Sequence, residues 1–408
     1  MSEKSIEGRI ALVFFLLAAM PGCWNPVLSI ILEAKGWERL TDWAFFIPAL
    51  GTILSPLCLA AVADQRVNAE RVLALVMGAN VLSTAAAFWF LGEADSQTGF
   101  LVCLILKALL GAPAWPLLMS ITLTHLTEPE RQFGRVRVWG TIGWMLAGWG
   151  ISWAALDQSP MAGIVAAGVG AVATLFCLAL PPTPPSGLRS KSLVESLGLR
   201  AVVILKDRDT GVYFLTAFLF MVPLAAYYIY TPKFLASLGV EKVATVMTVG
   251  QTSEIAAMLL IGWTFRRLPV KSIFLIALAL GLARYLFCFA GAWGEGQWSR
   301  WAQLAWVTLG IFMHGFCWTL FFESGRLFVD RRVPRELRSQ AQALLTIVTG
   351  GMGQITGIFV SGWIFRACLQ PGGWGWTGFW LILAVLCALA GLVFAVGYQG
   401  LAAARRGK

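Results

Sequence analysis

Long apolar stretches separated by short polar ones make up almost the whole chain, and the pattern repeats about twelve times. A helix needs about 20 mostly apolar residues to cross the ~30 Å hydrocarbon core of a bilayer. A soluble domain could not bury so many such segments, because single cores stop growing near about 250–300 residues. The pattern therefore predicts an all-α polytopic membrane protein with 12 transmembrane helices. The predicted spans are Ile10–Leu32, Trp43–Val62, Val72–Leu91, Gly99–Leu126, Val136–Leu156, Gly163–Leu180, Thr210–Tyr230, Ala244–Thr264, Val270–Ala292, Trp301–Phe322, Ser339–Ile364 and Trp374–Tyr398.

The longest polar connection divides these spans into six and six. Residues 181–209 begin with a run of prolines that cannot continue a helix, then become basic. We predict an N-terminal six-helix bundle over 1–180, a cytoplasmic linker over 181–209 with a short surface helix at Leu193–Leu205, and a C-terminal bundle over 210–408. The sequences of the two halves resemble one another weakly. Gly111–Trp115 in the fourth span corresponds to His314–Trp318 in the tenth. Two six-helix pseudo-repeat bundles are the plan of a secondary transporter, with the substrate held between them.

The placement of basic residues predicts the orientation. Most Lys and Arg side chains fall in the even-numbered loops and the termini, and Lys35, Arg39, Lys233, Lys242, Arg300 and Arg366 are those in the odd-numbered loops. Positive charge is retained in the cytoplasm during insertion, so both termini are predicted to be cytoplasmic. The net charge of +10 then reflects topology, and no basic stretch has the aromatic interleaving of a nucleic-acid-binding surface.

Composition argues against catalysis and against bound metals. The eight cysteines are scattered without a C-x-x-C pair, and the two histidines, His125 and His314, are far apart. Neither a phosphate-binding glycine loop nor a serine nucleophile motif is present. We therefore expect no enzyme activity, no cofactor and no metal, and a receptor would need a soluble ligand domain that the pattern does not contain.

Ionisable residues inside predicted spans are the first candidates for function, since they are costly at membrane depth. Glu254 lies in the middle of the eighth span, and Gln251 precedes it by three residues on the same helix face. Burial raises the pKa of a carboxyl group toward neutrality, which suits proton coupling. The alternative is a structural acid that is paired with a basic residue on another helix.

A second polar face is predicted at the start of the fifth span. Arg137, Thr141 and Trp144 are spaced i, i+4 and i+7, which aligns a cation, a hydroxyl and an aromatic ring. Such a face can hydrogen-bond a polyol and stack on a flat ring. The alternative is that Arg137 extends to the cytoplasmic interface.

Other side chains at membrane depth have weaker signals. Arg284 is expected to be structural, either pairing with an acid or reaching an interface, and Lys107 suits a cavity or an outer anchor equally well. His314 is expected to be a hydrogen-bonded packing residue, whereas Trp318 is a candidate stacking surface. Tyr227, Tyr228 and Tyr230, near the outer end of the seventh span, are expected to form an interfacial aromatic belt or a gate, and we favour the belt for Tyr230.

Several strings resemble the nucleoside:proton symporter family of the major facilitator superfamily. They are Arg137–Trp144, Gly250–Ile255, Ala283–Phe287, the stretch from His314 to Gln342, and, in the first span, Gly22 and Trp24. The loop Ala63–Arg66, with Arg71 after it, resembles the loop signature of the superfamily.

The resemblance implies nucleoside uptake driven by a proton gradient, by alternating access of the two halves. It implies that Arg137, Thr141, Gln251 and Glu254 line the nucleoside site, with aromatic residues at Trp144 and Trp318. The family has an aspartate where this chain has Thr319. Glu323, one turn later, is either a replacement proton-coupling acid or the partner of Arg326 in a local ion pair, and we favour the ion pair.

The expected partners are a nucleoside, protons and the lipid bilayer, and we expect a monomer in a bacterial inner membrane. A major facilitator carrier for another solute, such as a sugar, an organic anion or a drug, is the alternative. Arg137 and Lys107 would favour an anion among these.

Overall fold

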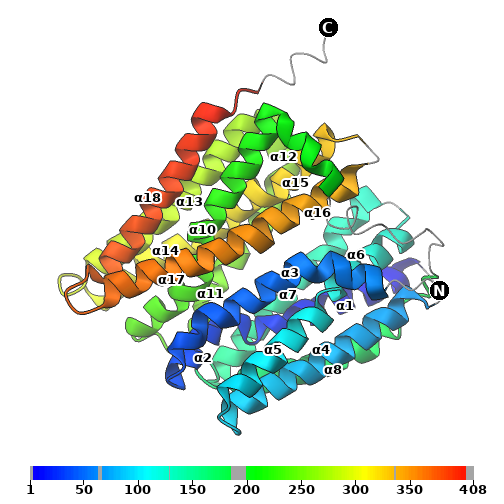
Figure 1. Cartoon of the computed structure of the whole chain (residues 1–408), viewed down its shortest axis with the longest axis horizontal. Helices are drawn as coiled ribbons and strands as arrows, with labels where there is room; N and C mark the ends of the chain where they lie inside the picture. The colour runs from blue at the N-terminus through cyan, green and yellow to red at the C-terminus, as the bar shows by residue number, and fades with distance from the viewer. Residues whose placement is uncertain (1–2, 63–66, 128, 185–198, 335–336, 401–408) are drawn as a thin grey trace. The chain divides into compact units, whose positions relative to one another are not determined.

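The computed structural model describes residues 3–62, 67–127, 129–184, 199–334 and 337–400, and within these ranges the regular structure is helical (Figure 1). Nine helical stretches of this described part are long and apolar enough to cross a membrane. Three further helices occupy the remaining predicted spans: α3 (Thr41–Val62), α7 (Pro129–Trp153) and α8 (Met161–Cys177). The prediction of an all-α polytopic membrane protein is confirmed.

The chain divides into two compact units, of which unit 1 comprises Met1–Leu193 together with Glu241–Thr248. Besides α3, α7 and α8, its helices are α1 (Glu3–Gly22), η1 (Asn25–Val27), α2 (Leu28–Ala34), η2 (Glu38–Leu40), α4 (Ala69–Gly92), α5 (Gln97–Gly111), α6 (Ala114–His125) and α11 (Val243–Met247). Within this unit α1 packs along α7. Gly22 permits the close approach, because a Cβ atom there would lie 2.9 Å from the Cα atom of Trp144.

Unit 2 comprises Val194–Val240 and Val249–Lys408. Its helices are η3 (Leu199–Lys206), α10 (Arg208–Ser237), α12 (Val249–Arg267), α13 (Val270–Trp293), α14 (Arg300–Trp318), η4 (Thr319–Glu323), α15 (Ser324–Arg332), α16 (Arg338–Thr346), η6 (Ile347–Gly353), α17 (Gln354–Leu369) and α18 (Gly375–Gly397). Its core is rich in aromatic contacts, such as the stacked rings of Tyr213 and Phe274 at 5.0 Å. Such pairs add stability beyond the burial of their surface.

Several predicted spans are interrupted rather than continuous. The fourth span breaks between α5 and α6 at Ala112 and Pro113, and the eighth breaks at Thr248 between α11 and α12. The elements η4 and η6 are π-helical turns inserted into the tenth and eleventh spans. Interrupted spans and π-turns are frequent at functional sites of membrane carriers.

Two predicted loop features fall partly or wholly outside the described residues. The predicted surface helix Leu193–Leu205 is described only from Leu199, where the chain forms the 3-10 helix η3. The loop Ala63–Arg66 lies outside the described residues. The domain limits 1–180, 181–209 and 210–408 stay a prediction.

Candidate functional site

Glu254 lies on α12 where this helix touches α14. The backbone N–H of Gly315 on α14 donates to Ser253 Oγ at 3.1 Å. A Cβ atom on Gly315 would overlap the backbone nitrogen of Glu254, so only glycine permits this approach. Glu254 and Gln251 are both partly buried, one turn apart.

A buried polar network connects α10, α13 and α14 beside Glu254. His314 Nδ1 lies 2.8 Å from Arg284 Nη1, and His314 Nε2 lies 2.9 Å from Tyr228 Oη. A guanidinium group can only donate, so Nδ1 of His314 accepts and the proton of the neutral ring is on Nε2. That proton is donated to the Tyr228 oxygen. The Glu254 carboxyl group is close enough to Tyr228 to interact with it electrostatically.

Arg284 anchors this network by an arrangement different from both predicted ones. Its side chain is completely buried, and its guanidinium group lies 4.8 Å from the ring centre of Tyr227 and 4.4 Å from that of Tyr285. It also donates to the Tyr285 hydroxyl. Within the described part of the chain it has no carboxylate partner, and burial keeps it away from an interface. Aromatic faces and neutral acceptors therefore stabilise this cation.

His314 is the hydrogen-bonded packing residue that the sequence predicted. Its ring stacks on Tyr227 at 4.3 Å and lies 6.3 Å from Trp318, which is itself 4.8 Å from Phe322. Trp318 is partly buried at the end of α14, where it directly precedes the π-turn η4.

Thr319 and Glu323 mark the two ends of η4. Thr319 is fully buried, and its hydroxyl has no hydrogen-bond partner within the described residues. The Glu323 carboxylate lies 3.8 Å from Arg326 Nε in the favoured i, i+3 ion pair. Both members of that pair are substantially exposed, so Glu323 is a weaker candidate than Glu254 for a buried proton site.

The predicted polar face in unit 1 is built on α7. The guanidinium group of Arg137 lies 4.7 Å from the ring centre of Trp115 on α6, and Phe14 on α1 packs edge-on against the same ring at 5.5 Å. Thr141 is 6% exposed and Trp144 is partly buried. Arg137 thus has an aromatic contact inside the unit, whereas the alternative placed it at the cytoplasmic interface.

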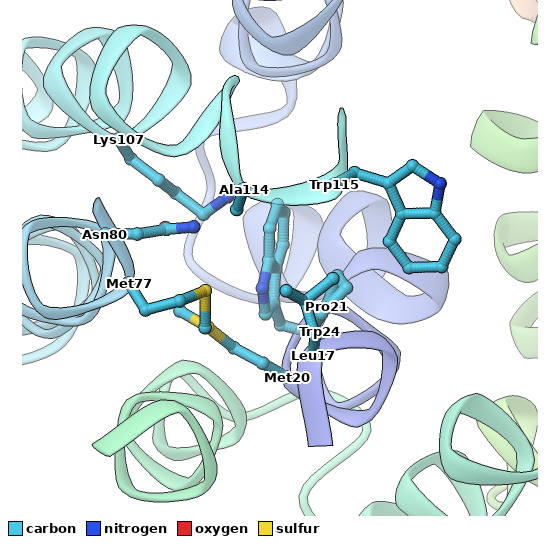
Figure 2. A pocket seen from close by; sticks show the side chains of 9 residues that line it. All are labelled: Leu17, Met20, Pro21, Trp24, Met77, Asn80, Lys107, Ala114 and Trp115. Carbon is cyan, nitrogen blue, oxygen red and sulfur yellow. The ribbon is translucent and has the colours of Figure 1, made fainter. Parts of the chain in front are cut away.

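Lys107 faces a cavity of about 130 Å³ in unit 1 (Figure 2). Its Nζ atom lies 4.8 Å from the ring centre of Trp24. Of the two roles considered for Lys107, the structure shows the cavity-facing one.

The sequence predicted a belt or a gate for Tyr227 and Tyr228 but not their contacts with Arg284 and His314. Tyr227 and Tyr285 are almost completely buried against Arg284, and the Tyr228 hydroxyl lies 2.9 Å from His314 Nε2. The placement of Tyr230 in an interfacial belt is wrong, because its ring is 2% exposed and stacks on Phe365 at 4.4 Å.

The described residues contain no cluster of His, Cys, Asp or Glu that could hold a metal ion. The six predicted substrate-binding residues fall into two groups. Arg137, Thr141 and Trp144 belong to unit 1, whereas Gln251, Glu254 and Trp318 belong to unit 2.

Comparison with known proteins gives matches over nearly the whole chain. The family model described as Nucleoside H+ symporter matches residues 4–401. YegT of Escherichia coli (strain K12) is 28% identical over 405 residues, covering 96% of this chain and 93% of that protein. The xanthosine permease of the same organism is 25% identical over 412 residues, covering 97% and 96% of the two chains.

A solved structure of a variant of the nucleoside transporter NupG superposes with a TM-score of 0.85. It is 22% identical, and the match covers 97% of this chain and all of that one. This similarity confirms the predicted major facilitator fold. The chain therefore belongs to the nucleoside H+ symporter family, and it is a multi-pass membrane transporter rather than an enzyme.

Proposed function

We propose that this protein imports nucleosides together with protons across a bacterial cytoplasmic membrane, with both termini in the cytoplasm, and that it works as a monomer. Membership of the symporter family supports the nucleoside and the proton as substrates. The relatives named xanthosine permease and nucleoside transporter NupG support the same class of solute.

Glu254 is the proposed proton-coupling residue. The observation that carries this assignment is the polar network on one side of its carboxyl group, from Tyr228 through His314 to Arg284. Arg284 occupies Nδ1 of His314, so the imidazole cannot take a proton there while that hydrogen bond persists. A partly buried carboxyl group can instead gain and lose a proton as access alternates, because burial disfavours its charged form.

Substrate contacts are proposed on both units. Arg137 and Thr141 in unit 1 supply donors for the sugar or base, and Trp144 supplies a ring. Gln251 and Trp318 supply an amide and a second ring from unit 2. Binding that draws on both units couples substrate occupancy to the exchange between outward and inward access.

The test is nucleoside uptake into proteoliposomes with an imposed inward proton gradient. We expect the wild-type protein to accumulate labelled uridine or adenosine above its external concentration. A Glu254→Gln variant should lose accumulation but retain exchange of internal for external nucleoside, because exchange needs no net proton movement.

A Glu323→Gln variant is the matched control, since it removes a carboxyl group from the same unit and an exposed ion pair. It should accumulate nucleoside like the wild type. Gradient-driven accumulation by Glu254→Gln, or its loss in Glu323→Gln alone, would contradict the assignment.

A further inference from the structure

The cavity beside Lys107 lies entirely within unit 1 and has a distinctive lining. Leu17, Met20 and Met77 form part of its apolar wall. Its polar groups are the Lys107 ammonium group, the Asn80 amide and the indole nitrogen of Trp24. Figure 2 shows the polar ends of Lys107 and Asn80 pointing toward each other beside the Trp24 ring.

All three polar groups can donate hydrogen bonds, and the described residues supply no acceptor for them. Trp24 is 1% exposed, and its Nε1 atom has no partner within the described residues. The Thr84 hydroxyl donates to the Asn80 backbone carbonyl at 2.7 Å and lies 3.3 Å from Asn80 Oδ1, and Figure 2 shows the Asn80 amide nitrogen on the cavity side. Among the described residues, the Lys107 ammonium group has no hydrogen-bond or ion-pair partner and lies over the Trp24 ring.

Such a set of donors calls for an acceptor-rich ligand. Buried polar groups are almost always hydrogen-bonded, and an unpaired cation at membrane depth has an unfavourable free energy. No carboxylate is among the residues that line the cavity. An incoming group with several oxygen acceptors, or a negative charge, would satisfy all three donors.

The volume of the cavity limits this group to one ring. A cavity of about 150 Å³ in another protein holds a benzene molecule, so about 130 Å³ fits a single six-membered ring rather than a whole nucleoside. The Trp24 ring and the methionine side chains supply the apolar contact that a flat ring needs.

The cavity adjoins the proposed substrate face. Trp115 lines the cavity, and the guanidinium group of Arg137 lies over the ring of the same residue. Figure 2 shows the Trp115 ring turned away from Lys107. A ring inside the cavity would therefore leave the rest of its molecule near Arg137.

We propose that this cavity receives the imide edge of a nucleobase, with its two ring carbonyl groups facing Lys107, Asn80 and Trp24. The cavity then selects nucleosides of the uracil and xanthine type over those whose base has an amino group at this edge, such as adenosine and cytidine. This inference rests on the proposed nucleoside transport and names the substrate class for it.

The test measures equilibrium binding of uridine, xanthosine, adenosine and cytidine to purified protein by calorimetry. These four probes share the ribose, so differences report on the base. The wild-type protein should bind uridine and xanthosine more tightly than adenosine and cytidine. A Lys107→Met variant should lose about ten-fold or more in affinity for the first pair, because hydrogen bonds to charged groups are strong, and less than three-fold for the second.

A Lys233→Met variant is the matched control. Lys233 is also a buried lysine over an aromatic ring, 5.5 Å from the centre of Phe365, but it belongs to unit 2. It should keep the wild-type order of affinities. If Lys107→Met does not fold, Asn80→Leu removes a second donor at similar volume and should reduce the same preference.

The possible failures are distinguishable. Wild-type protein that binds none of the four nucleosides would overturn the proposed function as well as this inference. Wild-type protein that binds nucleosides but shows no preference for the imide bases, or whose preference survives both Lys107→Met and Asn80→Leu, would overturn this inference alone.

Discussion

At the scale of single residues, the main feature is a buried cation that is stabilised without a carboxylate. Arg284 is enclosed by the rings of Tyr227 and Tyr285 and hydrogen-bonds to His314. Contact with an aromatic face stabilises a desolvated cation by about 2 kcal/mol. Removing one member of such a network leaves its partners unpaired, which destabilises the fold. The cation also fixes His314 in one neutral tautomer, whose Nε2–H donates to the Tyr228 hydroxyl.

The first residue-scale prediction concerns His314. A His314→Phe substitution keeps the ring contact with Tyr227 but removes the partners of Arg284 and Tyr228. We expect a loss of about 1–3 kcal/mol in the free energy of unfolding for each group left unsatisfied. A His314→Gln variant retains an acceptor and a donor, so it should lose less. Thermal unfolding in detergent provides the measurement, and equal stability of the two variants would contradict the role of the network.

The sequence alone located the acidic group but not its surroundings. Glu254 was predictable because a lone carboxyl group in an apolar span is costly. Its connection to His314 through Tyr228 was not predictable, because those two residues are 86 positions apart and meet only through helix packing. For the same reason, Arg284 was expected to pair with an acid or to reach an interface, whereas the fold surrounds it with aromatic rings.

At the scale of elements, the short helix α11 is held by side chains from the end of α7 and the loop after it. Ala244 N donates to Asp157 Oδ1 at 2.7 Å, and Thr245 N donates to Ser152 Oγ at 3.0 Å. The Ser152 hydroxyl donates to the same Asp157 oxygen at 2.9 Å. These bonds satisfy N–H groups that the start of a helix leaves free, and they attach α11 to unit 1.

The element-scale prediction concerns pH. Asp157 lies outside the membrane-spanning segments, and burial raises its pKa above the ordinary value for an aspartic acid. Since the folded state then binds the proton more tightly than the unfolded state, the contribution of Asp157 to stability is greatest in acid. This contribution to stability falls as the pH rises from the ordinary pKa of an aspartic acid to the raised pKa of Asp157. Above the raised pKa it is constant.

Hydrogen exchange at Ala244 and Thr245, corrected for the intrinsic pH dependence, measures this effect. Protection should decrease with rising pH in the wild type. An Asp157→Asn variant keeps an acceptor at the same position but does not titrate, so its protection should be independent of pH. A pH dependence that persists in Asp157→Asn would assign it to a different group.

The existence of the spans was predictable at this scale, but their interruptions were not. Twenty apolar residues define a helix that fits the bilayer whether it is straight or broken. The regular spacing of α14 ends at Trp318, because the π-helical element η4 starts at Thr319 and has more residues per turn. Pro113 is a visible cause of the break between α5 and α6.

At the scale of the whole molecule, charge placement predicts the membrane topology, and the packing divides the chain into two compact units. The central basic linker and the repeated pattern of spans were enough to predict two six-helix halves. The exchange of Glu241–Thr248 into unit 1 was not predictable, because the apolar pattern of the eighth span continues through Thr248.

The prediction at this scale is the orientation of the chain. Single cysteines introduced as Ser5→Cys and Gln399→Cys should react with a membrane-impermeant maleimide in inside-out vesicles only, because basic residues cluster on their side. Gln297→Cys, at an exposed site between α13 and α14, should react in right-side-out vesicles only. Reaction of all three from one side would contradict the predicted topology.

The eight residues 241–248 have a mechanical consequence. They pack with unit 1, while the chain on both sides of them packs with unit 2. Trp149 strengthens this attachment by donating its indole N–H to Thr248 Oγ1 at 2.7 Å. The backbone junctions at Val240–Glu241 and Thr248–Val249 are therefore where the chain passes from one unit to the other, and rotation of their φ and ψ angles must absorb any displacement between the units.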